Sequence, residues 1–209
     1  MTARFPDGAI FEGTVTLADV TIKPGIARGN MAQQSLAAFA IPWEAWKIHN
    51  AFQTPLTGTA GTDDLGLIGG VYGTSTPSIQ TSDADTTTVT QYARALLRLP
   101  IEYDAAQNIS LKFRAGMKTN ISDTTATLDV QAFRSDNEGL VDGADKYAGA
   151  ALTINSLTLA DKTFALTAGA FSPGDLIDVR ITIAITDGGT GAAVLGWIGQ
   201  SWLLCDVRG

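Results

Sequence analysis

Cysteine and histidine are almost absent from this sequence of 209 residues. Cys205 is the single cysteine, so no disulfide can form within the chain and a disulfide scaffold is excluded. His49 is the single histidine. Because zinc sites are built from clusters of cysteine and histidine, the composition also excludes a zinc site of that kind. Cys205 lies in an apolar run, where we expect the thiol to pack as a small hydrophobic group.

Charged residues are also scarce, at 17% of the chain. This is below the average of about 25% for globular proteins, so a coiled coil and a charged disordered tail are both excluded. The 14 basic residues are outnumbered by 21 acidic ones, which gives a formal net charge of −7. An acidic chain is poorly suited to bind phosphate backbones or anionic membranes, so we expect neither nucleic acid nor membrane as a partner.

Long hydrophobic runs are missing as well. No stretch of about 18 apolar residues occurs, so we expect no transmembrane helix. The first residues lack an apolar segment of the length found in signal peptides. These features predict a protein that is made and folded in a reducing cytoplasm.

Alternation of apolar and polar residues is the main pattern that is present. It begins at about residue 88 and is clearest in 177–185, where isoleucine or valine stands at every second position. The same pattern appears in 109–117 and 126–132, and the final apolar stretch spans 195–207. One-sided alternation of this kind indicates antiparallel sheets with one buried face. Shorter candidate strands are 90–99, 151–157 and 162–167.

The number and spacing of these segments predict the fold class. Seven or eight strands, separated by turn signals about every ten residues, are typical of an antiparallel β-sandwich of the jelly-roll type. We therefore predict an all-β protein, with a jelly-roll domain over residues 88–209. The turn Ser172-Pro173-Gly174-Asp175 leads into the clearest strand.

Residues 1–87 differ in composition and predict an extended N-terminal arm or loop region. Short β-like pieces occur in 9–22, and the alanine-rich segment 31–40 favours a helix. Residues 54–90 contain 11 threonines among 37 residues and few large apolar groups. Such a segment cannot pack a core of its own, so we expect a surface loop or an arm that a neighbouring subunit orders.

Four ring-bearing side chains recur at a spacing of three within the arm. They are Trp43, Trp46, His49 and Phe52. If 43–52 forms one or two helical turns, this spacing places them on one face. We interpret the stripe as a surface that contacts another subunit, because aromatic residues are enriched at protein interfaces.

No motif predicts catalysis, and we expect the protein not to be an enzyme. His49 has no accompanying Gly-x-Ser-x-Gly elbow, and the glycine-rich run 188–191 lacks the Lys-Ser/Thr ending of a phosphate-binding loop. The acidic loop 136–145 carries four carboxylates without EF-hand spacing, so a solvated hairpin loop is favoured over a calcium site. We expect no cofactor and no resident metal.

The tryptophans leave one alternative open. Trp197 and Trp202 stand at odd spacing in the final strand, so we expect them on opposite faces of the sheet. Exposed aromatic rings on a jelly roll can stack on sugar rings. A carbohydrate-binding module is therefore an alternative to a role in protein–protein packing.

Three segments carry a resemblance to a known family. They are 96–117 (LLRLPIEYDAAQNISLKFRAGM), 126–134 (ATLDVQAFR) and 172–179 (SPGDLIDV). Their order resembles small jelly-roll virion proteins of tailed bacteriophages, in particular capsid decoration (cement) proteins. Phe5-Pro6-Asp7-Gly8 and Gly13-Thr14-Val15-Thr16-Leu17 are similar to the arm-like starts of such proteins. The resemblance covers about 60% of the chain and brings no catalytic residues.

The resemblance implies a virion structural protein on the outer surface of the capsid. Such proteins are often trimers that bind across neighbouring copies of the major capsid protein, which would be the partner here. A head-fibre, tail or baseplate component is the alternative within the virion. For the capsid role we expect the contacts to come from Phe5, Phe11, Trp43, Trp46 and Phe52, with His49 at the same interface.

Overall fold

The protein is described by a computed structural model over residues 34–105, 107–135, 141–189 and 192–208. Its elements are β1 (Gln34–Ala40), the 3-10 helix η2 (Trp43–Ala45), β2 (Gly66–Ile68), β3 (Ser78–Gln80), β4 (Thr88–Arg98), β5 (Ile109–Met117), β6 (Thr125–Ser135), β7 (Val141–Asp142), β8 (Leu152–Thr153), β9 (Ala160–Ala165), β10 (Leu176–Thr186) and β11 (Gly196–Arg208). The described chain is therefore all-β, with a single short helical turn.

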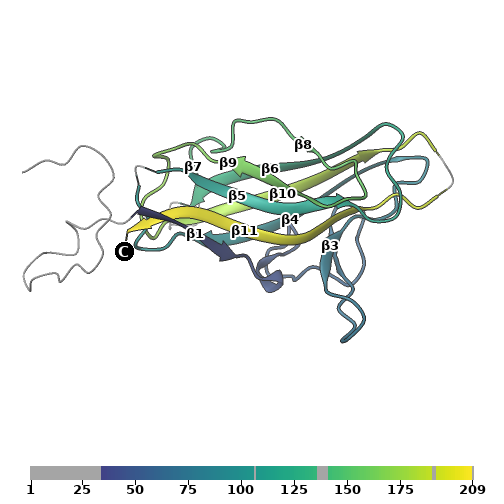
Figure 1. Cartoon of the computed structure of the whole chain (residues 1–209), viewed down its shortest axis with the longest axis horizontal. Coiled ribbons are helices and arrows are strands. Elements are labelled where there is room, and N and C mark those ends of the chain that lie inside the picture. Colours follow the sequence, from purple (N-terminus) through teal and green to yellow (C-terminus); the bar gives the residue numbers. More distant parts are fainter. Residues whose placement is uncertain (1–33, 106, 136–140, 190–191, 209) are drawn as a thin grey trace, which may run out of the picture. The chain divides into compact units, whose positions relative to one another are not determined.

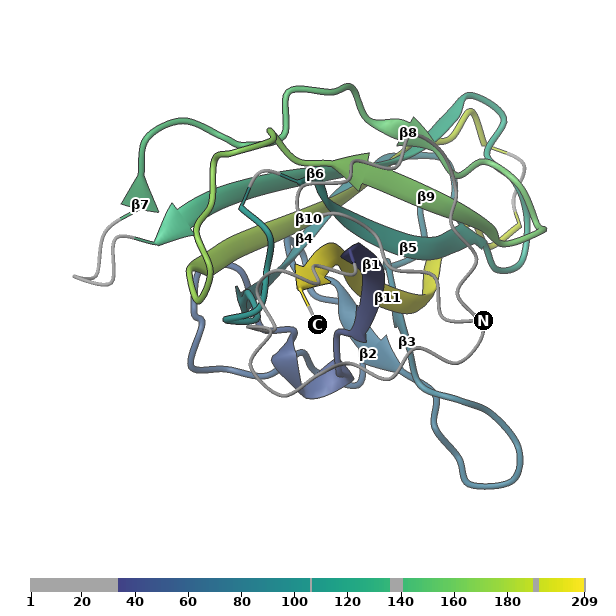
Figure 2. The same cartoon turned by 60° about the vertical axis from the view of Figure 1, so that its left-hand side comes forward.

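Two antiparallel sheets form a β-sandwich of the jelly-roll type, as the alternation predicts. In one sheet the strand order is β2-β3-β11-β5-β9, and β1 also pairs with β11. In the other the order is β4-β10-β6-β7, and β8 also pairs with β6. Figures 1 and 2 show the long strands of both sheets running side by side. All of the pairings between these strands are antiparallel.

The core lies between the two sheets and is made by the residues that the alternation selects. Every second residue of β10 from Ile177 to Ile185 is fully buried, as are Leu111 and Phe113 of β5. Leu128 and Val130 of β6, which neighbours β10 in its sheet, are also buried, and β5 belongs to the opposite sheet. These residues are β-branched or large and apolar, so they both favour the extended backbone and fill the space between the layers. The predicted register of these three strands is confirmed.

The alanine-rich segment is a strand, so the prediction of a helix is wrong for residues 34–40. β1 pairs with β11 in unbroken register from Gln34↔Arg208 to Ala40↔Trp202. The free edge of β11 provides a ladder of backbone hydrogen bonds, and this tertiary pairing overrides the helix preference of alanine. Residues 31–33 of the expected helix lie outside the described residues.

Residues 54–90 are ordered by contacts within the same chain. Leu65 and Ile79 are buried in the sandwich core and anchor this segment. The buried side chain of Gln91 accepts a hydrogen bond from the Ser82 amide at 2.8 Å, and Asp83 Oδ1 accepts one from the Val194 amide at 2.8 Å. A segment with few apolar residues is held here by polar bonds to β4 and to the residues before β11.

The division of the chain therefore differs from the expected boundary between residues 87 and 88. The described residues from Gln34 onward belong to one compact unit. β1 and β3 both pair with the C-terminal strand β11, which places the described part of the expected arm in a sheet of the sandwich. Across the described residues, no helix is long and apolar enough to cross a membrane.

Candidate functional site

The aromatic stripe expected over residues 43–52 does not form a single face. Helix η2 covers Trp43–Ala45 alone, and Trp46 already has an extended backbone. Trp46 is 1% exposed, and its indole nitrogen donates a hydrogen bond to Ser201 Oγ at 3.3 Å. Its ring packs against Phe113, with the ring centroids 6.1 Å apart. The prediction that Trp46 is a surface contact is therefore wrong, because its side chain is part of the core.

Trp43 stays partly exposed beside β1 and β11. It lines a hollow of about 220 Å³ together with Trp202 and the segment Ala40–Pro42. Of the two tryptophans predicted to lie on one stripe, Trp43 alone is therefore at the surface. Phe5 and Phe11, the other expected contacts, lie outside the described residues.

An apolar surface follows β1, which has no described strand on its second edge. Leu36 is 67% exposed and Phe39 is 40% exposed. These two side chains are three positions apart in a strand of unbroken register, so they face opposite sides of β1. On the side of Phe39 lies a hollow of about 230 Å³, which we call the β1 groove. It is lined by Phe39, Ala40, Ile41, Pro42, Ala45, Leu96, Leu97, Arg98 and Leu203. An apolar groove beside an open strand edge is suited to contact with another protein.

His49 and Phe52 lie over the outer face of the sheet β4-β10-β6-β7. Their segment is fixed by backbone bonds between Lys47 and Arg94, 2.8 and 3.0 Å long, along the edge of β4. The His49 ring packs on Tyr92 with centroids 4.7 Å apart, and its Nδ1 lies 2.9 Å from Asp64 Oδ1. Phe52 lies beneath the Arg94 guanidinium, 5.3 Å from its carbon. The helical face expected to carry these two residues is absent, whereas their expected contact with another subunit stays a prediction.

The outer face of this sheet holds a polar cleft of about 440 Å³, which we call the arginine cleft. It is lined by His49, Asn50, Arg94, Gln131, Phe133, Val141, Asp178 and Arg180. Arg94 donates to both carboxylate oxygens of Asp178, and its Nε–Oδ1 bond is 2.7 Å long. This hydrogen bond to Asp178 raises the pKa of Arg94, so the guanidinium stays charged at every relevant pH.

Arg180 is the second cation of the arginine cleft. Its guanidinium lies over the Tyr92 ring, 4.9 Å from the centroid, and its terminal nitrogen donates to Gln131 Oε1. The Nε atom of Arg180 is buried and has no hydrogen-bond partner among the described residues. Sequence reasoning missed this cleft, because its members come from four strands and one loop and share no local motif.

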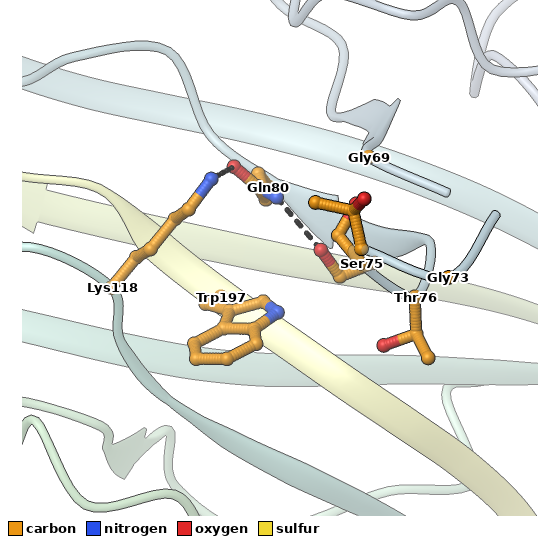
Figure 3. A pocket seen from close by; sticks show the side chains of 9 residues that line it. Gly69, Gly73, Ser75, Thr76, Gln80, Lys118 and Trp197 are labelled. Carbon is orange, nitrogen blue, oxygen red and sulfur yellow. Dashed lines mark hydrogen bonds between the residues drawn. The ribbon is translucent and has the colours of Figure 1, made fainter. Parts of the chain in front are cut away.

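A fourth hollow, of about 640 Å³, lies between the β2–β3 loop and strands β3 and β11 of the same sheet; we call it the tryptophan pocket. Figure 3 shows Trp197 on one side of it and Ser75 and Thr76 of the loop on another. Lys118 Nζ donates to Gln80 Oε1 at 2.9 Å, and Gln80 Nε2 donates to Ser78 Oγ at 2.7 Å. The indole nitrogen of Trp197 has no hydrogen-bond partner among the described residues.

Trp197 and Trp202 lie on the same face of their sheet, which corrects the prediction of opposite faces. The pairing of β11 with β5 shifts register between Ile198 and Gln200. One additional residue at this bulge reverses the alternation, because side chains change face at every position. Ile198 before the bulge and Leu203 after it both point into the core, so both tryptophans point outward.

No group of three or more histidine, cysteine or acidic side chains is placed to hold a metal ion in the described chain. Part of the acidic loop 136–145 lies outside the described residues. Its described Asp145 accepts hydrogen bonds from the amides of Ala132 and Tyr147, each 2.9 Å long.

Comparisons with known proteins give similarities of low score. No protein-family model matches the chain, and the search of curated proteins finds no relative. Among solved structures, the CBM22-1 xylan-binding domain from Paenibacillus barcinonensis Xyn10C aligns with 84% of this chain and 97% of its own, at 10% identity and a TM-score of 0.40. The xylan-binding module CBM15 aligns with 82% of this chain and 97% of its own, at 10% identity and a TM-score of 0.40.

A viral structure is also among the similar ones. That of infectious bursal disease virus, Gx strain, aligns with 91% of this chain and 54% of its own, at 13% identity and a TM-score of 0.29. At these scores the similarities carry no argument about ligand or partner. The all-β sandwich rests on the strand pairing described above, and the function has to be argued from the surface of this chain.

Proposed function

We propose that the protein is a virion structural protein that decorates and stabilises a phage capsid. In this role it binds across neighbouring copies of the major capsid protein on the outer capsid surface, as a homotrimer. The observation that supports the proposal is the open edge of β1, where Leu36 is exposed on one face of the strand and Phe39 is exposed on the other face, beside the β1 groove. The resemblance of 96–117, 126–134 and 172–179 to capsid decoration proteins points in the same direction.

The physical basis of the proposal is burial of this surface against another protein. Removing apolar surface from water is favourable by about 25 cal/mol for each Å², and this gain has to exceed the loss of translational and rotational freedom on association. The open edge of β1 adds backbone donors and acceptors that can pair with a strand of a partner. A trimer would repeat a modest contact three times, and the effective concentration of the linked sites would make the total binding strong.

The test compares two variants of the full chain on capsids that lack this protein. Leu36→Lys combined with Phe39→Asp places charges on the β1 surface, and we expect binding to capsids in co-sedimentation to fall at least about tenfold. Leu157→Asp makes a similar change at a leucine that is 55% exposed near the opposite end of β11, and it serves as the control. Capsid binding that is unchanged in the first variant, or absent in the unmodified protein, would contradict the proposal.

The tryptophan pocket supports a second candidate, a carbohydrate-binding function. Sugar rings stack on indole faces, and their hydroxyl groups bond to amide, hydroxyl and ammonium groups of the kind that Gln80, Ser75 and Lys118 bring to this pocket. Trp197 supplies the ring, and its indole nitrogen is an unpaired donor among the described residues.

A glycan array probed with the full-length protein tests this candidate. We expect binding to a glycan that is lost in Trp197→Ala and kept in Trp43→Ala, which removes the same kind of ring from a different hollow, beside Gln200–Trp202. An array without hits, or equal binding by both variants, would remove the carbohydrate-binding candidate and leave the capsid proposal untouched.

A further inference from the structure

The outer face of the sheet β4-β10-β6 places two arginines directly opposite each other. Arg94 of β4 and Arg180 of β10 are register partners, and Arg180 is in turn opposite Gln131 of β6. Like charges at directly opposed positions of neighbouring strands are unfavourable. The arrangement is therefore not explained by stability of the sheet alone.

The surroundings hold both guanidinium groups in place. Arg94 lies over the Phe52 ring and donates hydrogen bonds to Asp178. Arg180 lies over the Tyr92 ring and donates a hydrogen bond to Gln131. Stacking on aromatic rings and hydrogen bonding restrict the rotamers of both side chains, so little further ordering is needed when a ligand binds. The site is preorganised on the strands of a rigid sheet rather than on a free loop.

The charges of the arginine cleft do not balance. Two arginines and the single carboxylate of Asp178 leave one positive charge, on a chain whose formal net charge is −7. Arg180 has the neutral amide of Gln131 as its hydrogen-bond partner, and its buried Nε has none among the described residues. A ligand with a single negative charge would neutralise the excess positive charge of the cleft. A phosphate carries about two negative charges, so it would leave an excess negative charge beside the carboxylate of Asp178.

The cleft and the β1 groove are lined by neighbouring residues. Leu96 is the register partner of Asp178, is 41% exposed, and lines the groove with Phe39. A protein segment that fills the β1 groove with apolar side chains thus lies next to the strand positions that line the arginine cleft. A small free anion has no apolar groups that could be buried in the β1 groove.

We propose that the arginine cleft binds a carboxylate side chain from an acidic segment of the partner protein. Apolar neighbours of that side chain occupy the β1 groove, and the carboxylate lies between Arg94 and Arg180. This inference rests on the proposed function, since it names the chemistry of the partner at the same surface. It differs from the carbohydrate candidate, which concerns the tryptophan pocket on the other sheet.

The test titrates the full-length protein with a blocked peptide, acetyl-Gly-Leu-Glu-Leu-Gly-amide, and follows the arginine Nε–H signals by NMR. We expect the signals of Arg94 and Arg180 to shift at millimolar peptide, and the peptide with glutamine in place of glutamate to leave them unmoved. Equal effects of the two peptides, or no shift up to about 10 mM, would overturn the proposal.

Arginine variants distinguish peptide binding in the arginine cleft from general attraction between the peptide and positive charges of the protein. Arg180→Gln should weaken binding of the glutamate peptide about tenfold or more, because it removes a charged hydrogen-bond donor to the carboxylate. Arg114→Gln makes the same change on the outer face of the other sheet and should bind as the unmodified protein does. If Arg180→Gln fails to fold, Arg180→Lys keeps the charge without the planar fork and should also weaken binding. Unchanged affinity in the folded Arg180 variant would overturn the proposal.

Two further probes identify the source of the carboxylate. Sodium glucuronate and inorganic phosphate should each shift the two signals less than the glutamate peptide does at equal concentration. A larger response to either would show a site for small anions and would overturn the assignment to a protein segment. Because no capsid is used, failure here with intact capsid binding removes this inference alone.

Discussion

Trp46 and Trp43 stand three residues apart and have different roles. Trp46 is buried against Phe113 and Ser201, whereas Trp43 lies at the rim of a surface hollow. The spacing of three suggested a common face, but this holds only in a helix, and η2 ends before Trp46. The distinction decides which of the two can contact a partner.

Trp46→Ala should therefore destabilise the fold, while Trp43→Ala should not. We expect the free energy of unfolding to fall by about 3–5 kcal/mol for Trp46→Ala, because the change leaves a cavity in the core. For Trp43→Ala we expect a change below about 1 kcal/mol. Urea denaturation followed by circular dichroism measures both. Equal losses in the two variants would show that Trp46 is not a core residue.

Cys205 is buried in β11, and burial raises the pKa of its thiol from 9.0 to about 11. The thiolate is the reactive form, so the thiol should resist a disulfide reagent at neutral pH until the protein unfolds. Because the folded state keeps its proton while the unfolded state loses it, the free energy of unfolding should decrease as pH rises from about 9 to 11.

A labelling series in increasing urea checks the thiol, and Cys205→Ala provides the reference for the pH dependence. Rapid labelling of the folded protein, or the same decrease of stability with pH in Cys205→Ala, would contradict this prediction.

At the scale of elements, residues 54–90 show why a low apolar content is an unreliable sign of an arm. Leu65 and Ile79 give the segment two anchors in the core. Its backbone also bonds to neighbouring strands: the Leu65 amide donates to Tyr92 O at 2.9 Å, and the Ala84 amide donates to Val194 O at 3.0 Å. Polar contacts between distant parts of the chain leave no periodic pattern in the sequence.

Hydrogen exchange of the isolated protein tests whether residues 54–90 are structured without a partner. The amides of Leu65, Thr81 and Ala84 should exchange slowly, because each donates to a backbone carbonyl of the sandwich. The amides of Gly73 and Thr59, for which no backbone bond to the sheets is found in the described chain, should exchange fast. Fast exchange throughout 54–90 would instead support an arm that becomes ordered on a partner.

At the scale of the whole molecule, the proposed trimer has a thermodynamic consequence. Association that favours the folded chain makes the melting temperature depend on protein concentration. We expect the melting temperature to rise over a hundredfold range of concentration, and light scattering after gel filtration to give three times the mass of 21.8 kDa. Leu36→Lys with Phe39→Asp should keep the trimer mass, because the proposal assigns the β1 surface to the capsid protein. A constant melting temperature and the mass of one chain would contradict the trimer.

The sequence alone determined the sandwich and its core. The alternation in 109–117, 126–132 and 177–185 marks which side chains are buried, because a strand with one buried face needs an apolar residue at every second position. The turn at Ser172–Asp175 was equally predictable: the Asp175 amide bonds to Ser172 O at 3.1 Å, and Gly174 takes the positive φ that glycine permits. Such features depend on residues that are near one another in the chain.

Only the tertiary structure decided the rest. Residues 34–40 became a strand because the edge of β11 was available, and one bulged residue after Ile198 turned Trp197 and Trp202 to the same face. Arg94 and Arg180 are 86 positions apart and meet because β4 and β10 pair in one register. The surfaces proposed to bind partners are therefore produced by long-range pairing, which local spacing does not encode.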